Sequence, residues 1–361
     1  MSSERVYNFS AGPSMLPLEV LERAGGEITN YQGSGMSVME MSHRSKVFDK
    51  IFQDTKDRFR RLFRVPDNYH ILFLQGGASA QFSMVPLNLM GRTGRADYAV
   101  TGNFSSIACK EAKKYGAVNL AASSEDRNHT YIPAQDQLKL DPGASYFHYC
   151  ANNTIYGTEW QYIPDTGDVP LVCDMSSDFL SRAVDVSRYG IIYGGAQKNL
   201  APAGLTVAIV RDDLLGGELP CTPLMMSYKL MADKDSMYNT PPCWCIYMLG
   251  LVLEWLEGRG GVEGMEKIKH GKAALLYDVL DSSRLFTCAA ESGSRSDMNV
   301  TFRTADPELD ARFVAEAAAA GFVNLKGHRL VGGMRASIYN AMPVEGVEKL
   351  ADFIRAFDKS N

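Results

Sequence analysis

Short apolar runs alternate with amphipathic stretches from about residue 70 to residue 210. Such runs predict strands buried on both faces, at His70–Leu74, Tyr98–Thr101, Ser145–Tyr149, Val169–Cys173, Gly190–Tyr193 and Leu205–Val210. Amphipathic segments between some of them, such as Phe104–Tyr115, predict helices. The alternation is typical of an α/β domain whose mainly parallel sheet is covered by helices on both faces. Ligands of such sheets bind beyond the carboxyl ends of the strands, so the residues after each run are candidates for a site.

The flanking segments predict further helices and a second, smaller domain. Apolar residues at helical spacing predict a core helix over Lys46–Phe63, and a strongly apolar helix ends at Leu256. The glycine-rich stretch 258–261 then marks a domain boundary. Beyond it we predict a small α+β domain, with helices at Val262–Leu280, Leu309–Ala320 and Val344–Phe357 and strands at Asn299–Phe302 and Arg335–Tyr339. The predicted large domain covers residues 17–259, and the small domain covers residues 260–361 together with residues 1–16.

Composition and charge narrow the class of protein. The chain has 361 residues, is 45% hydrophobic, and carries a formal net charge of −5, which argues against a broad nucleic-acid or anionic-membrane surface. Seven cysteines form an odd set without a repeating spacing, so we expect free, mostly buried thiols and no metal site. The N-terminus lacks the apolar core of a signal peptide, and the longest apolar stretch, Trp244–Leu256, is too short to span a bilayer. We expect a cytoplasmic protein.

Asp174 and Lys198 each follow a predicted buried strand. An unpaired carboxylate at such a strand end is costly, so Asp174 either caps the turn that follows or neutralises a buried cation, such as the protonated ring nitrogen of pyridoxal phosphate. Lys198 follows the run GIIYGGAQ, and a lone lysine there is either solvated or held as a free amine for Schiff-base chemistry. Together, the two strand-end residues indicate pyridoxal-phosphate chemistry more specifically than either residue alone.

A run of small residues and two basic clusters add to this pair. The sequence QGGASA at residues 75–80 follows a strand and opens a helix, which suits a phosphate, but it matches neither GxGxxG nor GxxxxGK[ST]. One basic cluster contains His43 and Arg44, and the other contains His328, Arg329 and Arg335. Arginine binds carboxylates through forked hydrogen bonds, so two clusters suit a substrate that is anionic at both ends. Each cluster taken singly is equally compatible with solvated arginines near a turn.

Several motifs together resemble a known family over nearly the whole chain. They are NFSAGPSMLP, SVMEMSHRS, LQGGASAQFSMVPLNL, DMSSDFLSR, YGGAQKNLAPAGLT, YNTPP and GHRLVGGMRASIYNAMP. With these motifs the chain resembles the phosphoserine aminotransferases, class V members of the fold-type I pyridoxal-phosphate-dependent family. The resemblance implies a large domain with a seven-stranded-type sheet and a small C-terminal α+β domain. It also implies amino-group transfer between L-glutamate and 3-phosphohydroxypyruvate in serine biosynthesis, giving O-phospho-L-serine and 2-oxoglutarate.

The resemblance implies roles for individual residues. Lys198 would bind the cofactor covalently, and Asp174 would keep its pyridine nitrogen protonated. Further cofactor contacts would come from Ala78, Ser79, Phe104, Thr154, Ser176 and Gln197. Asn239 and Thr240 would reach the cofactor phosphate of a neighbouring subunit, so a homodimer is implied. The substrate's anionic ends would be bound by His43, Arg44, His328, Arg329 and Arg335.

Two departures and three alternatives accompany this interpretation. Phe104 occupies the ring-stacking position that is often tryptophan in the family, and the GGASAQ run lacks the further glycine and the arginine or cysteine of some relatives. Another class V enzyme, such as a cysteine desulfurase, would need a reactive cysteine, and only Cys221 lies in an evident loop. A nucleotide-dependent enzyme would need a phosphate-loop signature. A non-catalytic scaffold would gain nothing from keeping Asp174, Gln197 and Lys198 together.

Overall fold

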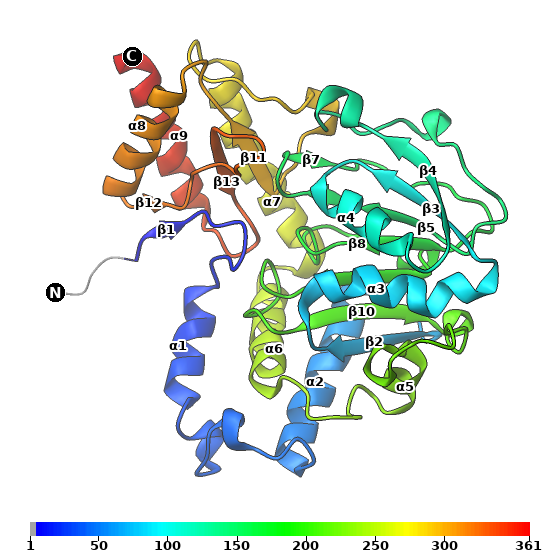
Figure 1. The fold of residues 1–361 in the computed structure, drawn as a ribbon. Coiled ribbons are helices and arrows are strands. Elements are labelled where there is room, and N and C mark those ends of the chain that lie inside the picture. The colour runs from blue at the N-terminus through cyan, green and yellow to red at the C-terminus, as the bar shows by residue number, and fades with distance from the viewer. Residues whose placement is uncertain (1–4) are drawn as a thin grey trace.

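A seven-stranded sheet forms the centre of the computed structural model, which describes residues 5–361 (Figure 1). The strand order is β2-β10-β9-β8-β5-β3-β4, and every neighbouring pair is parallel except that β10 is antiparallel to both β9 and β2. The strands of this sheet are β2 (Tyr69–Leu74), β3 (Arg95–Val100), β4 (Ala117–Ser123), β5 (Phe147–Cys150), β8 (Leu171–Asp174), β9 (Ile191–Gly195) and β10 (Thr206–Arg211). Because β10 is antiparallel to both of its neighbours, β2 and β9 run in the same direction, which is also that of the parallel strands.

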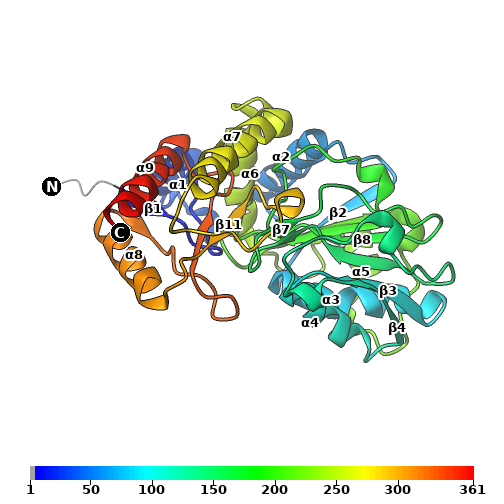
Figure 2. The same cartoon turned by 90° about the horizontal axis from the view of Figure 1, so that it is seen from above.

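Helices cover both faces of this sheet because its strands are apolar at consecutive positions. In β2, Ile71 and Phe73 join the core under one set of helices, whereas Leu72 and Leu74 join the core under the other. Figure 2 shows α3 and α4 on one face and α2, α6 and α7 on the other. The large-domain helices are α1 (Leu18–Glu27), α2 (Lys46–Phe63), α3 (Gly77–Leu89), α4 (Asn103–Ala112), α5 (Tyr228–Asp233) and α6 (Cys243–Glu257). Burial on both faces is what makes the strand sequences continuously hydrophobic.

A separate apolar core holds the C-terminal part together. It is built from α7 (Gly261–Asp281), α8 (Pro307–Ala319), α9 (Val344–Ser360) and the antiparallel pair β11 (Asn299–Phe302) and β13 (Met334–Ser337). The N-terminal strand β1 (Tyr7–Asn8) pairs with β12 (Phe322–Val323), so the start of the chain packs with its end. Helix α7 contributes to both cores, with Met265 in the large one and Leu276 in the small one.

The fold confirms most of the elements predicted from the sequence. The six predicted strands of the large domain, the helix Lys46–Phe63 and the elements of the small domain are present, with ends shifted by a few residues. Strand β4 was not predicted because most of its residues before Ala121 are exposed at the sheet edge, where no apolar run is needed. Within residues 5–361, no helix is long and apolar enough to cross a membrane. The domain boundary near residue 259 stays a prediction.

Candidate active site

Lys198 lies in the turn after β9 with its amine buried. Its Nζ donates a hydrogen bond to Thr154 Oγ1 at 2.7 Å and lies 5.4 Å from the centre of the Phe104 ring. Only 9% of the residue is exposed. The backbone on either side is fixed by Ser14, whose N–H donates to Gln197 O at 2.9 Å and whose hydroxyl donates to Lys198 O. The amine is therefore desolvated and held by a single neutral partner.

Asp174 ends β8 with a buried carboxylate. Its Oδ1 accepts hydrogen bonds from the Ser176 N–H at 2.9 Å and the Ser176 hydroxyl at 2.6 Å, and that hydroxyl in turn accepts from the Gly195 N–H at 3.1 Å. Its Oδ2 accepts no hydrogen bond from the described residues 5–361. Burial raises the pKa of Asp174, although the bonds from Ser176 and the charge of Lys198 act in the opposite direction. One oxygen is thus fixed, and the other is available to a cation or donor.

The topology brings these residues to one edge of the sheet. Strands β5, β8 and β9 are parallel neighbours, so their carboxyl ends meet at the same edge. Thr154 follows the short strand β6 (Asn152–Asn153) just beyond β5, and Phe104 lies in the first turn of α4 just beyond β3. The structure thus places Asp174, Lys198, Thr154 and Phe104 along one edge of the sheet, and their roles toward a cofactor stay predictions.

The predicted phosphate cradle lies at the same edge, where β2 gives way to α3. Gly76 precedes the helix with φ +97°, a backbone conformation that glycine adopts readily and other residues rarely do. The first N–H groups of a helix have no intrahelical partner, so those of Gly77, Ala78 and Ser79 are free to bind an anion. Gln75 Nε2 donates to Thr240 O at 2.6 Å, which places the YNTPP segment beside the cradle.

Gln197 and Asn239 line the space around the edge of the sheet. The Gln197 side chain lies over Gly195, where an added Cβ would be 2.6 Å from its Oε1. A cavity of about 380 Å³ opens beside the cradle, and its walls include Gly76, Ala80 and Asn239. Asn239 and Thr240 therefore lie next to the cradle of their own chain, and their predicted contact with a second subunit stays a prediction.

Arg335 brings a positive charge to the site from the small domain. It lies on β13, and its guanidinium donates to Thr154 O at 3.3 Å, while its buried Nε has no partner among residues 5–361. Burial lowers the pKa of Arg335. The pKa of His328 is also lowered, chiefly by burial, and the charges of Arg335 and Arg329 act in the same direction. Of the second predicted basic cluster, Arg335 contacts Thr154, whereas Arg329 is exposed, and the roles of His328 and Arg329 stay predictions.

The first basic cluster is not assembled with the rest. His43 and Arg44 precede α2, whose N-terminal end lies at the bottom of Figure 1, away from the carboxyl edge of the sheet. Arg44 is exposed, and His43 Nε2 is buried without a partner in the part of the chain that the structure describes. No hydrogen bond or ion pair within residues 5–361 joins either residue to Lys198 or Arg335. A single chain therefore brings Arg335 to its site but not the cluster of His43 and Arg44.

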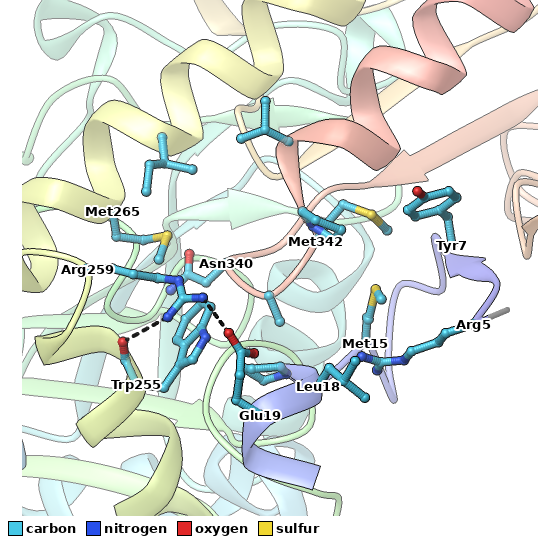
Figure 3. Close-up of a pocket in the computed structure, with 15 residues that line it drawn as sticks. Arg5, Tyr7, Met15, Leu18, Glu19, Trp255, Arg259, Met265, Asn340 and Met342 are labelled. Atoms are coloured by element: carbon cyan, nitrogen blue, oxygen red, sulfur yellow. Dashed lines mark hydrogen bonds and ion pairs between the residues drawn. The ribbon is translucent and has the colours of Figure 1, made fainter. Parts of the chain in front are cut away.

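A cavity larger than the one beside the cradle lies elsewhere. It has a volume of about 620 Å³ and opens between the start of α1, the end of α6 and the loop after β13 (Figure 3). Arg259 crosses it, with an ion pair to Glu19 at 2.9 Å and its guanidinium stacked 4.1 Å from the Trp255 ring. None of the predicted site residues lines it. We therefore assign the site by the chemistry at the sheet edge and not by cavity size.

Sequence reasoning overlooked the N-terminal segment as part of the site. An added Cβ on Gly12 would lie 3.4 Å from Lys198 Cγ, and Ser14 fixes the backbone of Gln197 and Lys198. The motif NFSAGPS was the available signal, but its residues carry no titratable group. Its role is to close the turn that holds the lysine.

Comparisons with known proteins agree with this geometry. A family model described as aminotransferase class-V matches residues 6–350. The phosphoserine aminotransferase of Herminiimonas arsenicoxydans is 53% identical over 359 residues, covering 99% of each chain. The solved phosphoserine aminotransferase from Bacillus circulans subsp. alkalophilus has a TM-score of 0.97 and 48% identity, again over 99% of each chain. A PLP-bound phosphoserine aminotransferase from Trichomonas vaginalis has a TM-score of 0.94 and 41% identity, covering 97% of this chain and 100% of that one.

Proposed function

Because the chain belongs to the class-V aminotransferase family, we propose that it is a pyridoxal-phosphate-dependent phosphoserine aminotransferase. It transfers the amino group of L-glutamate to 3-phosphohydroxypyruvate, giving 2-oxoglutarate and O-phospho-L-serine for serine biosynthesis. The observation that carries the proposal is the buried amine of Lys198, which has one neutral partner, at the same sheet edge as the buried carboxylate of Asp174.

The residues at the sheet edge fit pyridoxal phosphate. Asp174 has a free, desolvated carboxylate oxygen that suits the protonated ring nitrogen, and the Phe104 ring beside Lys198 suits stacking on a flat aromatic ring. The N–H groups of Ala78 and Ser79 suit the phosphate. Thr154, Ser176 and Gln197 supply further polar contacts. When bound, the cofactor withdraws electrons from the substrate and makes its Cα proton acidic.

The chain's own groups then handle the proton and the substrate's charges. Lys198 Nζ would hold the cofactor covalently and, as a free amine, would take the proton from the substrate Cα and carry it for return. Thr154 Oγ1 accepts from this amine and so directs its lone pair. Asp174 stays ionised beside a cation, which offsets the cost of its burial.

Arg335 binds an anionic end of the substrate. It is a desolvated cation without an acidic partner in residues 5–361, and a buried guanidinium of this kind gains most from a carboxylate or phosphate. His328 and Arg329, on the loop before β13, extend the positive field. Since glutamate and the phosphorylated substrate are both anionic at two ends, one dual-anion site serves both half-reactions.

A second copy of the chain supplies the other anion-binding cluster. Because His43 and Arg44 lie away from Lys198 in their own chain, they act on substrate only at the site of a partner. Large apolar side chains are exposed in the same region, which favours contact between copies; they are Leu18, Leu21, Ile28, Met36, Met39 and Val47. Asn239 and Thr240 would contact the cofactor phosphate of the partner subunit. The active form is accordingly a homodimer.

The cysteines bear on location and on the desulfurase alternative. All seven are free, and Cys109, Cys150, Cys173 and Cys245 are buried. Free thiols are typical of a reducing compartment, which supports a cytoplasmic location. Burial raises the pKa of Cys150, although the charge of Lys198 acts in the opposite direction. The Cys150 thiol therefore stays protonated and unreactive.

Formation of O-phosphoserine tests the proposal. The cofactor-loaded protein is incubated with L-glutamate and 3-phosphohydroxypyruvate, and the product is identified by mass spectrometry. We expect O-phosphoserine together with an equal amount of 2-oxoglutarate, and a much lower rate with hydroxypyruvate, which lacks the phosphate. Release of sulfide from cysteine without any O-phosphoserine would replace the proposal with a desulfurase.

A further inference from the structure

One face of the β11–β13 pair is polar although it is buried. The alternate residues Val300, Phe302, Met334 and Ala336 belong to the apolar core of the small domain. The opposite face carries Asn299 paired with Ser337 and Thr301 paired with Arg335. The two-residue period of a strand thus turns one face toward the small core and the other, with Arg335, toward the large domain. Figures 1 and 2 both show β11 beside β7 (Thr158–Glu159) of the large domain.

This polar face is docked closely on the segment that contains Thr154. Thr301 Oγ1 donates to Tyr156 O at 3.1 Å, and the Ser296 N–H donates to Gly157 O at 2.9 Å. Gly157 has φ +74°, and an added Cβ there would lie 2.6 Å from Thr301 Oγ1. The contact therefore requires glycine and leaves no room for sliding. Arg335 is placed against Thr154 by this docking.

Two asparagines, each 0% exposed, link the domains at the centre of this contact. Asn152 Nδ2 donates to Asn299 Oδ1 at 2.7 Å and to Ser177 Oγ at 2.8 Å, while its Oδ1 accepts from Ser296 Oγ at 2.5 Å. Asn299 Nδ2 donates to Ser337 Oγ at 2.9 Å and to Tyr339 Oη at 3.1 Å. All four protons of the two side-chain amides donate to a partner. The direction of each hydrogen bond is therefore fixed, and the network has one arrangement.

The network ends on both sides of the lysine. On one side, Ser177 donates to Asn152 O at 2.9 Å and follows Ser176, which holds Asp174. On the other side, Tyr339 Oη donates to Ala11 O at 2.8 Å, directly before the Gly12 that packs on Lys198. A shift of the small domain would therefore have to break buried bonds next to both Asp174 and Lys198.

We propose that Asn152 and Asn299 are positioning residues that fix Arg335 relative to Asp174 and Lys198, so that a dianionic substrate meets the amine and the guanidinium in register. This inference rests on the proposed function, because it takes Arg335 as a group that binds an anionic end of the substrate. Neither asparagine touches the reacting atoms. They act through the docking of β13. In this way they fix the distance between Arg335 and the pair formed by Asp174 and Lys198.

A double-mutant cycle on the cofactor-loaded homodimer tests the proposal with glutarate, a dicarboxylate of glutamate's length that has no amino group to react. Its dissociation constant is measured by calorimetry for the wild type, Asn152→Ala, Arg335→Ala and the combination. We expect Asn152→Ala to weaken binding on the order of tenfold. The combination should bind no more weakly than Arg335→Ala alone, because a misplaced arginine and an absent one have the same consequence. Effects that multiply would overturn the proposal, since Asn152 would then act independently of Arg335.

Two further variants guard against loss of the fold. Tyr339→Phe removes a single hydroxyl from the network without changing the shape of the side chain, and it should weaken glutarate binding roughly threefold. Ser283→Ala breaks hydrogen bonds to Asp358 and to Leu285 outside the network and should leave binding unchanged. Wild-type binding of glutarate without O-phosphoserine formation would count against the proposed function alone. Equal effects of Tyr339→Phe and Ser283→Ala, or no glutarate binding by the wild type, would count against the positioning network.

Discussion

Of the three lysines that are buried within residues 5–361, Lys198 and Lys272 have opposite surroundings. Lys272 in α7 is 1% exposed, and its Nζ donates to three backbone carbonyls, those of Ile338, Tyr339 and Met342, at 2.7–3.0 Å. Lys198 is 9% exposed, and its Nζ donates to one hydroxyl. An ammonium has three protons, so Lys272 is fully satisfied and Lys198 is not. The comparison teaches that a lysine retained for packing uses all its protons on the fold, whereas a lysine retained for chemistry is desolvated and left available.

The largest expected effect follows from removing the available amine. Lys198→Ala should lower kcat by at least about 1000-fold, because the variant lacks both the attachment point and the base that moves the Cα proton. The melting temperature should change little, since the lysine makes one side-chain hydrogen bond. Steady-state kinetics and calorimetry measure the two quantities. Near-normal turnover in this variant would remove Lys198 from the reaction.

Replacing the satisfied lysine should give the reverse result. Lys272→Met keeps the length of the side chain but removes a donor from three backbone carbonyls, of which Tyr339 O keeps the Met342 N–H at 3.0 Å, and we expect this loss to lower the free energy of unfolding on the order of 3 kcal/mol. The folded variant should still bind its cofactor covalently. Denaturant unfolding and the absorbance spectrum report on these points. If Lys272→Met were as stable as the wild type but did not bind the cofactor covalently, the assignment of the two lysines would be wrong.

Arg335 extends the comparison to a guanidinium. Arg335→Ala should raise KM for both substrates on the order of 100-fold with little effect on unfolding, because the group is desolvated and lacks an acidic partner. Arg44→Ala should likewise raise KM, provided that the homodimer forms. Arg295 serves as the matched control, since it is bound to Asp281 at 2.6 and 2.7 Å, and Arg295→Ala should leave KM unchanged. Identical kinetics for all three variants would exclude both clusters from the site.

The smallest expected effect is on the pH dependence of stability. Burial lowers the pKa of Lys272 to about 7, while a lysine in the unfolded chain titrates near ~10.4. Between these values the unfolded state binds more protons, so this residue makes the free energy of unfolding rise with pH. The stability deficit of Lys272→Met relative to the wild type should therefore grow from about pH 6.5 to about pH 9. A deficit that shrinks over this range would contradict the assigned direction.

The sequence predicted the sheet well because its strands are buried on both faces. Runs such as Val169–Cys173 and Leu205–Val210 are apolar at nearly every position for that reason, and the positions of Asp174 and Lys198 after such runs placed both at the carboxyl edge. The exposed edge strand β4 has no such run and was missed. Periodicity reports burial, so it fails where a strand faces solvent.

The contacts within the site were beyond prediction from spacing. Lys198 meets Thr154 across 44 positions, and Asn152 meets Asn299 across 147, and no periodic pattern relates residues so far apart. The family resemblance implied that Thr154 is a cofactor contact. Neither the resemblance nor the sequence pattern indicated that Thr154 O also accepts a hydrogen bond from Arg335. The role proposed for Arg44 requires a second copy of the chain, which one sequence does not describe.

The most direct test of the available amine is an ultraviolet–visible spectrum of the pyridoxal-phosphate-loaded protein before and after adding L-glutamate. We predict a near-visible band from the lysine-bound cofactor in the wild type and in Lys272→Met, its loss on adding glutamate, and a spectrum without that band in Lys198→Ala. A lysine-bound band that persists in Lys198→Ala, or a wild-type band that ignores glutamate, would contradict the account.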